Sequence, residues 1–370
     1  MPEAAVLDPI QKLHRDIKKA AIDLSENEVR YLVDYYYIAQ EDRKRSFNQE
    51  KSLEKGDEPH DVISWLAKQS KSLEDTIKAA LGVWAAGRPA GAWAQSICGI
   101  GPVISAGLLA HIDIDQAPTV GHIWSFAGLD PSRTWVGREK FENIAKNHDG
   151  DLNKILDTVA AESGISRAKL EGMVLNDNKK ITLKNLKAKA TKRPFNAQLK
   201  SLVAFKLGEC FVKVQNNDKD IYGAVFAQKK AVEIERNDAG LFVGQAADKL
   251  KKYKIKKDTD AYAWYSGSLT PENAATLRLM ENKKEGDARK LAGEPGSGLA
   301  MLPPAHIHAR ARRYVVKLFL AHFHEALWRE KYGNADKLPM PYIFTDQAKK
   351  LGLGDHTHLF KFPDPEGIFA

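Results

Sequence analysis

Two glycines flank one apolar residue between two apolar helical segments, and this pattern limits the possible folds most. The stretch Ile97–Leu129 reads ICGIGPVISAGLLAHIDIDQAPTVGHIWSFAGL, with the glycines at positions 99 and 101. Because glycine lacks a Cβ, the backbone there can turn tightly and approach a partner closely. Pro102 suits the first position of a helix, where its missing N–H would have no partner. The pattern predicts two helices joined by a Gly99–Gly101 turn.

The second of these helices predicts both a packed side and an anion site. Its apolar spacing places Val103, Ala106, Leu109 and Ala110 on the buried side. Its first turn combines unpaired N–H groups with the positive end of the helix dipole, which together attract anions such as a nucleic-acid phosphate. This is the helix-hairpin-helix pattern, and the residues expected to meet phosphate are Gly99, Ile100, Gly101 and Ser105. The alternative is a tight helical connection without a ligand.

Composition favours a polyanionic partner inside a reducing compartment. The 370 residues include 56 Lys and Arg against 48 Asp and Glu, a formal net charge of +8. The two cysteines, Cys98 and Cys210, lie in apolar helical contexts without disulfide or zinc spacing. The sequence shows no signal-peptide pattern and no apolar run near the roughly 18 residues of a membrane span. We therefore expect a cytoplasmic protein.

Helical periodicity extends over most of the chain and predicts an all-α fold with several helices. The long helix from about His60 to Ala86 is the clearest, with one stripe expected to be buried: Val62, Leu66, Leu73, Ile77, Leu81 and Trp84. Ser25 and Glu28 form a capping box for the helix before it. Further helices are expected at residues 8–24, 122–127, 197–214, 218–237, 239–253, 271–283 and 304–332.

These segments suggest six regions along the chain. They are an N-terminal helical region (1–58), a long helix with the helix-hairpin-helix core (59–139), a basic insertion (140–192), a helical continuation of the core (193–292), a flexible glycine linker at 293–298 followed by a long helix (293–336), and a Pro/Gly-rich tail (337–370).

Within the insertion, residues 152–175 fit a helix-turn-helix. Gly164 suits the turn and Ser166 the N-cap of the second helix, on which Arg167 and Lys169 would face a DNA groove or backbone. The alternative is an ordinary helical hairpin that ends on a glycine.

Basic residues elsewhere complete the set of candidate DNA contacts. Residues 179–200 contain Lys and Arg but no Asp or Glu, whereas the lysine-rich run 249–257 is interpreted as a solvated face. On the last long helix, His306, Arg310, Arg313 and Lys317 form a basic stripe. The candidate DNA-binding side chains are Arg133, Arg138, Lys140, Arg167, Lys169, Lys192, Arg193, Asn196, Lys200, Arg310 and Arg313.

Three runs resemble one family of mobile-element enzymes. The runs ICGIGPVISAGLLAHIDI, HIWSFAGLDPSRTWVG and KRPFNAQLKSLVAFKLGECF are similar to the C-terminal transposase domain of the bridge-RNA-guided insertion-sequence transposases. The matching positions are 99–101, 127–131 and Lys192, Arg193, Asn196, Leu199 and Lys200. The similarity covers roughly residues 60–215, with an insertion from Lys140, and is strongest over 97–137. It implies a helical DNA-binding scaffold.

The sequence also departs from that family at both parts of the family's catalytic machinery. The RuvC-like half of the family holds Mg²⁺ with acidic residues that begin on a β-strand, but the first 95 residues here contain no such strand pattern. The family's serine nucleophile precedes the counterpart of Gly137, where this chain has Trp135-Val136. Ser132 is a weak substitute, because the sequence shows no base beside it.

Three functions follow from these patterns. The first is a DNA-binding protein, in recombination or transposition, which holds phosphates and needs no cofactor for binding. The second is an active transposase that uses a displaced serine or a partner's nuclease, with Mg²⁺ required only for catalysis. The third is a helix-hairpin-helix DNA glycosylase or base-modifying enzyme, although Gly121 stands where its aspartate would be. An RNA guide, a partner protein, RNA binding and a purely structural role all remain open.

Overall fold

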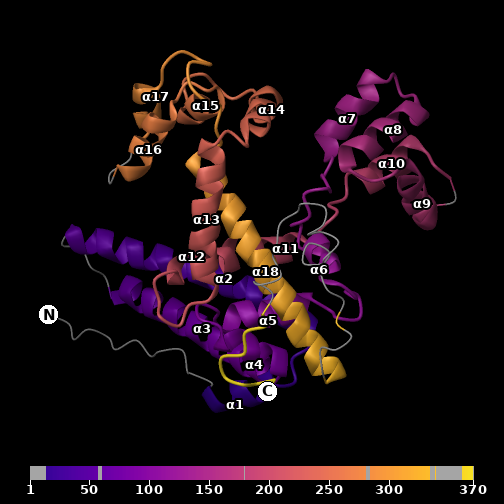
Figure 1. Ribbon diagram of the computed structural model, residues 1–370. Helices are drawn as coiled ribbons and strands as arrows, with labels where there is room; N and C mark the ends of the chain where they lie inside the picture. The colour runs from indigo at the N-terminus through magenta and orange to yellow at the C-terminus, as the bar shows by residue number, and fades with distance from the viewer. Residues whose placement is uncertain are drawn as a thin grey trace. The chain divides into compact units, whose positions relative to one another are not determined.

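The computed structural model describes residues 14–56, 61–178, 180–280, 284–333, 338 and 361–369. Within these ranges the chain forms helices and no β-strand, which confirms the predicted all-α class (Figure 1). None of the described helices is both long and apolar enough to cross a membrane.

The chain divides into two compact units. Unit 1 comprises Met1–Leu207 and Leu318–Ala370, and unit 2 comprises Gly208–Lys317. Unit 1 holds α1 (His14–Ala21), α2 (Glu26–Lys55), α3 (Asp61–Ala86), α4 (Pro89–Ser96), α5 (Pro102–His111), α6 (Val120–Phe126), α7 (Arg138–Asn147), α8 (Leu152–Ser163), α9 (Arg167–Asp177), α10 (Leu183–Ala190), α11 (Ala197–Ser201) and a π-helix (Leu202–Leu207). Unit 2 holds α12 (Gly208–Val214), α13 (Tyr222–Asp238), α14 (Val243–Tyr253), α15 (Asp260–Tyr265), α16 (Pro271–Leu279) and α17 (Asp287–Leu291), and α18 (Pro304–Tyr332) contributes to both units.

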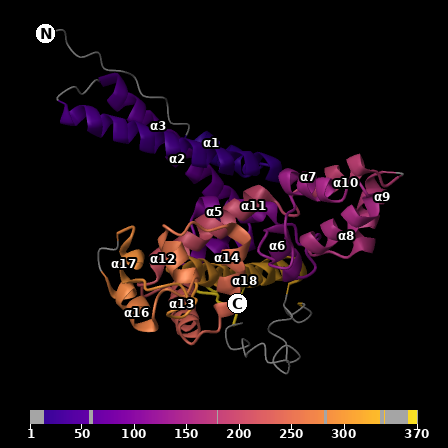
Figure 2. The ribbon, with the colours of Figure 1, turned by 90° about the horizontal axis from the view of Figure 1, so that it is seen from above.

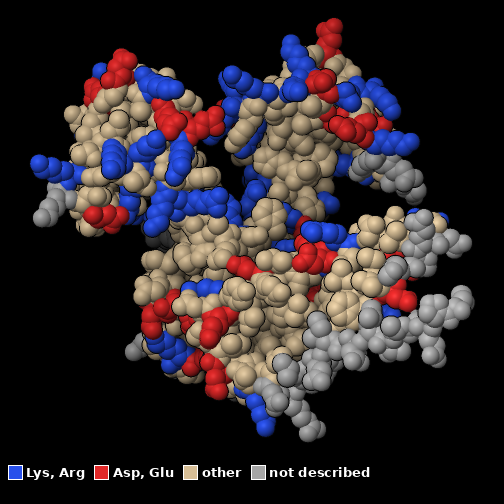
Figure 3. Space-filling model, turned by 180° about the vertical axis from the view of Figure 1, so that it is seen from behind, with Lys and Arg blue, Asp and Glu red and all other residues tan. Residues whose placement is uncertain are grey.

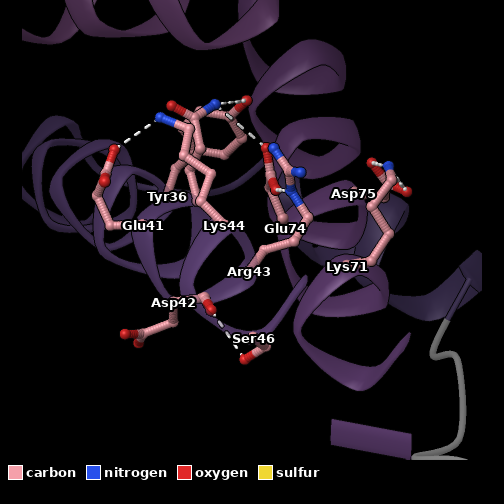
Figure 4. Close-up of polar contacts among 10 residues, drawn as sticks. Tyr36, Glu41, Asp42, Arg43, Lys44, Ser46, Lys71, Glu74 and Asp75 are labelled. Carbon is pink, nitrogen blue, oxygen red and sulfur yellow. Dashed lines mark hydrogen bonds and ion pairs between the residues drawn. The ribbon is translucent and has the colours of Figure 1, made fainter. Parts of the chain in front are cut away.

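The core of unit 1 forms where α2, α3 and α5 pack together, and α2 and α3 lie side by side in both ribbon views (Figures 1 and 2). The predicted capping box of α2 is confirmed, because Ser25 and Glu28 exchange side-chain to backbone hydrogen bonds. Between α2 and α3, the buried carboxylate of Glu74 accepts from Arg43 and from Gln40, the latter at 3.2 Å (Figure 4). Burial and the charge of Glu74 raise the pKa of Tyr36 beside it to about 12.

The predicted apolar stripe of α3 is only half correct. Ile77, Leu81 and Trp84 are buried, whereas Val62, Leu66 and Leu73 are 49 %, 46 % and 42 % exposed. The reason is local packing: α5 and α4 cover α3 only in its later part, so the earlier part has α2 as its main neighbour. An amphipathic stripe thus marks the side that faces a partner helix without ensuring that it is covered along its whole length.

The described end of the tail packs on α4. The Trp93 ring stacks on Phe319 of α18 and on Phe362, with centroids 5.7 Å and 5.2 Å apart, and its indole N–H donates to the Pro363 carbonyl at 2.6 Å. At the start of α4, the Ala90 amide donates to the Glu330 carboxylate at 2.8 Å. Residues 361–369 are therefore part of unit 1, while most of the predicted tail region lies outside the described residues.

Helices α7 to α10 have an apolar core of their own within unit 1. It is formed by Phe141, Ile155, Val159, Leu170, Val174 and Leu186 with their neighbours. Gly164 ends α8 in the left-handed conformation, at φ +70°, and Ser166 caps α9 by accepting from the Lys169 amide. The two helices and the glycine turn predicted at 152–175 are confirmed here, whereas the helix-turn-helix assignment and its contact with DNA stay predictions.

In unit 2, the predicted flexible linker at 293–298 is wrong. The Gly293 amide donates to the Ser268 carbonyl and the Gly298 amide to the Gly267 carbonyl, each at 2.7 Å. A Cβ at position 298 would lie 2.2 Å from the Leu269 carbonyl oxygen. Because glycine lacks a Cβ, these residues allow two backbone segments to approach closely. Glycine can therefore serve packing as well as flexibility.

Candidate nucleic-acid interface

The Gly99–Gly101 turn is a tight backbone reversal with an apolar anchor. The Ile100 amide donates to the Ile97 carbonyl at 3.0 Å, and Gly99 within this turn has φ +92°, a conformation that favours glycine. The Ile100 side chain is 6 % exposed, whereas Gly99 is exposed and Gly101 is half-buried. The anchored isoleucine fixes the turn while its two glycines stay accessible.

Gly101 is the N-cap of α5 and leaves space for a ligand. Its carbonyl accepts the first helical bonds, from Ile104 at 3.2 Å and Ser105 at 3.1 Å. A Cβ built at position 101 would have no heavy atom within 4 Å, and the local φ of −105° suits any residue. Within the described part of the chain, the amides of Gly101 and Val103 have no backbone acceptor, so they can serve an anion.

Two of the predicted contacts in this region are corrected. Ser105 is fully buried and its hydroxyl donates to the Pro102 carbonyl at 3.0 Å, so it cannot reach a phosphate. The Ile100 amide is already engaged within the turn. The apolar side predicted for this helix is confirmed, since Val103, Ala106, Leu109 and Ala110 are all buried.

A groove of about 430 Å³ beside Pro102 brings in two cations that the sequence did not indicate. Lys18 of α1 and Lys78 of α3 line it, together with Gly82 and Asp75. Asp75 is paired with Lys71 at 2.6 Å, so the groove stays cationic. Lys18 and Lys78 are distant in sequence, and only the packing of α1 on α3 places them beside α5.

The loop from Asp130 to Gly137 presents Arg133 to solvent. Asp130 Oδ1 accepts from the Ser132 amide at 2.9 Å and from the Ser132 hydroxyl at 2.7 Å, so this serine does have a carboxylate partner. The loop is held to the end of α8, because the Thr134 amide donates to the Ser163 carbonyl at 3.2 Å. Arg133 is exposed and forms no ion pair within the described residues.

The cations of α7 to α9 differ in availability. Arg167 binds Asp157 at 2.9 Å and Glu171 at 2.8 Å, and Lys140 pairs with Glu162. A phosphate would have to compete with these carboxylates. Arg138 and Lys169 are exposed and have no ion pair in the described ranges. Figure 3 shows blue Lys and Arg side chains over α7–α10 at the upper left, with red acidic side chains among them.

Residues 192–200 place cations beside aromatic rings. Lys192 and Arg193 are exposed, and the Arg193 guanidinium lies 5.1 Å from the centroid of the Trp135 ring. The Lys200 ammonium lies 4.0 Å from the Phe195 ring. Asn196 is the N-cap of α11, where its Oδ1 accepts from the Leu199 amide at 2.9 Å. We did not single out Trp135 from the sequence as a binding residue, because an isolated tryptophan in a loop has no distinctive spacing.

In unit 2, Arg310 is mainly a structural residue. It binds the buried carboxylate of Glu233 at 2.8 Å and lies 4.4 Å from the Phe242 ring. Arg313 is exposed on the same helix. Burial and nearby cations, Lys249 first, lower the pKa of His306 on this stripe to about 4.

A second cavity, of about 890 Å³, lies between α2, the end of α5 and α6. Arg30, His111, His122, Asp130 and Arg133 are among its lining residues. Burial and the charge of Arg30 lower the pKa of His111 to about 4.

The described residues contain no cluster of three or more His, Cys, Asp or Glu side chains that could hold a metal ion.

Comparison with known proteins finds a family match for one segment of the chain. Residues 92–172 match the model of the transposase family described as IS116/IS110/IS902. No curated protein and no solved structure matches the chain significantly.

The chain therefore contains a transposase-like domain, and the matched segment runs from α4 into α9. The matched range includes the Gly99–Gly101 turn and the Arg133 loop, and it runs beyond Lys140 into the segment that we expected to be an insertion.

Proposed function

We propose that this chain binds DNA in a transposition-related process and holds the phosphate backbone through a helix-hairpin-helix formed by α4, the Gly99–Gly101 turn and α5. The observation that carries the proposal is the open N-cap at Gly101: free amides, an unobstructed approach and a helix dipole coincide there. The family match over the same residues supports DNA as the polyanion.

Nearby cations extend this contact. Lys18 and Lys78 line the groove beside Pro102, and Arg133, Lys192 and Arg193 are exposed elsewhere in unit 1. Contacts of this kind position a protein on the backbone without reading base sequence. We therefore expect similar affinities for unrelated duplexes, with any sequence preference arising from the α9 residues Arg167 and Lys169.

The direct test is Gly101→Asp. Aspartate is a good N-cap and position 101 has room for it, so the variant should fold at least as well as the wild type while its carboxylate occupies the anion site. We expect at least tenfold weaker binding to every duplex in a fluorescence-anisotropy titration. Gly101→Asn should bind DNA better than Gly101→Asp, because it caps the helix without the negative charge.

Gly244→Asp is the matched control. Gly244 also has no heavy atom within 4 Å of a built Cβ, and it lies in the first turn of α14 in unit 2. This variant adds the same charge to a helix of unit 2 and should bind DNA normally. Normal binding by Gly101→Asp, or equal losses in both variants, would contradict the proposal.

One observation supports active strand transfer as a second candidate. The Ser132 hydroxyl donates to Asp130 at 2.7 Å, which is the pairing of a nucleophile with a base. The same contacts also make an ordinary turn in which an aspartate caps its own loop. Strand cleavage or joining with Mg²⁺ present, lost in Ser132→Ala, would establish this activity, whereas no product with the wild type would exclude it under those conditions.

A further inference from the structure

A pocket of about 430 Å³ opens between the Arg133 loop, α8, α9 and residues 189–196. Its walls are mostly apolar and include Phe126, Trp135, Met173 and Phe195. Phe126 and Trp135 are 45 % and 43 % exposed, which is high for large aromatic side chains. Pockets of about 300–1,000 Å³ with apolar walls and a few polar groups commonly hold small-molecule ligands.

Hydrogen bonds between neighbouring segments hold this pocket in shape. The Trp135 indole N–H donates to the Thr191 carbonyl at 2.9 Å, and the Asn196 amide donates to the Phe126 carbonyl at 2.8 Å. Both contacts join segments that are far apart in the sequence. The aromatic walls are thus positioned before any ligand arrives, which lowers the cost of binding.

The charged residues that line the pocket are all basic. Its lining residues include Arg133, Lys189, Lys192 and Arg193 but no Asp or Glu. Lys189 pairs with Asp177 at 2.6 Å, which leaves the other three as available cations. Asn196 uses its Oδ1 to cap α11, so its NH₂ group can donate to a ligand. The site thus suits a ligand with a planar apolar part, hydrogen-bonding edges and an attached negative charge.

We propose that this pocket holds one unpaired nucleobase of the bound DNA, with the base against Trp135 and Phe126 and its phosphates beside Arg133 and Arg193. A base within a stacked duplex cannot enter such a pocket, so the nucleotide must be extrahelical. This inference rests on the proposed DNA binding and adds that the preferred DNA contains an unpaired nucleotide.

The test compares two duplexes that differ by one base. One carries a single-nucleotide bulge and the other an abasic residue at the same bulge, so both have the same backbone and bend site. Stacking on one aromatic ring changes affinity by about 5- to 150-fold per base, and we expect the bulged base to bind more tightly within that range. Equal affinities of the wild type for the two duplexes would overturn the pocket assignment without any variant.

Variants identify the ring responsible. Trp135→Ala should remove the preference for the bulged base, while Trp135→Phe, which keeps an aromatic face, should retain most of it. Tyr253→Ala is the matched control, because Tyr253 is 56 % exposed with the Lys249 ammonium 4.7 Å from its ring, but lies in unit 2. A 2-aminopurine at the bulge should be quenched on binding by the wild type, through the Trp135 indole, but not by Trp135→Ala. Retained quenching in a folded Trp135→Ala variant would contradict the assignment.

The outcomes separate this inference from the proposed function. Salt-sensitive binding with equal affinity for the bulged and abasic duplexes would overturn the pocket alone. An absence of DNA binding would overturn both. Tighter binding of the same bulged duplex made of RNA would contradict the choice of DNA as the occupant.

Discussion

At Gly164, one missing side chain decides where the Arg133 loop can lie. A Cβ at this position would stand 1.9 Å from the Ser132 carbonyl oxygen, and the backbone there has φ +70°. The adjacent Ser163 carbonyl accepts the Thr134 amide. The loop and the end of α8 therefore approach each other through a glycine that both the space and the conformation require.

We predict that Gly164→Ala lowers the free energy of unfolding by more than the roughly 1–2 kcal/mol expected from a left-handed alanine alone. Gly150→Ala is the control, because Gly150 has φ +76° but no heavy atom within 4 Å of a built Cβ. Denaturant unfolding of the two variants measures the difference. Equal losses would show that the contact with Ser132 has no energetic importance.

The sequence was informative for residues whose role is local. Gly99, the capping pair Ser25 and Glu28, and the Gly164–Ser166 turn are as predicted, because these roles depend on positions a few residues apart. It failed where tertiary packing sets a side chain's surroundings. Ser105 is buried, Arg310 neutralises Glu233, and Lys18 and Lys78 reach the groove beside Pro102 through tertiary packing.

Between α13 and α18 of unit 2, one buried carboxylate joins the two helices. Glu233, with a side chain 3 % exposed, pairs with Lys229 at 2.9 Å, Arg236 at 3.5 Å and Arg310 at 2.8 Å. Burial opposes ionisation, but Lys229 and Arg310 outweigh it and lower the pKa of Glu233. The carboxylate thus balances cations that would otherwise repel one another.

Replacing this carboxylate tests its structural role. Glu233→Gln should lower the free energy of unfolding of unit 2 by about 3 kcal/mol. This value is at the lower end of the loss expected when a buried ion pair is broken, because Arg310 and Lys229 reach solvent. The neighbouring exposed Glu235→Gln should change it by no more than about 0.5 kcal/mol. Thermal melting of both variants measures the effect, and equal melting temperatures would refute this role.

The positions of the helices could be predicted from the sequence. How much of each apolar side other helices cover could not. Periodicity located α3 and α18 closely, yet Val62, Leu66 and Leu73 are exposed because coverage depends on where other helices end. Composition also misled at 293–298, where glycines that suggested a flexible linker instead allow two backbones to touch. Periodicity reports the side of a helix that is apolar, whereas packing decides how much of it is buried.

For the molecule as a whole, buried histidines link stability to pH. Burial lowers the pKa of His322 and, together with nearby cations, that of His111 and His306, each to about 4. In the unfolded chain these imidazoles have the ordinary value near 6.5. Between pH 6.5 and 4 the unfolded state therefore binds protons that the folded state does not, and stability falls as the pH falls.

We predict that the melting temperature decreases steadily from pH 7 to pH 4.5. His111→Gln should flatten this decrease, because it removes one of the groups that take up a proton on unfolding. The exposed His122→Gln serves as the control. Calorimetry at several pH values measures the slope, and an identical slope in His111→Gln and the wild type would show that His111 does not contribute.

The central claim is that unit 1 holds DNA phosphates, and the salt dependence of binding tests it most directly. Each neutralised phosphate contributes about −0.9 to the slope of log K against log salt concentration for duplex DNA. With Lys78 in the groove beside the turn, Arg133 and Arg193 each neutralising a phosphate, we predict a slope of about −2.7 or steeper. The slope should be shallower in Gly101→Asp and unchanged in Gly244→Asp. A wild-type affinity that does not vary with salt would contradict the account.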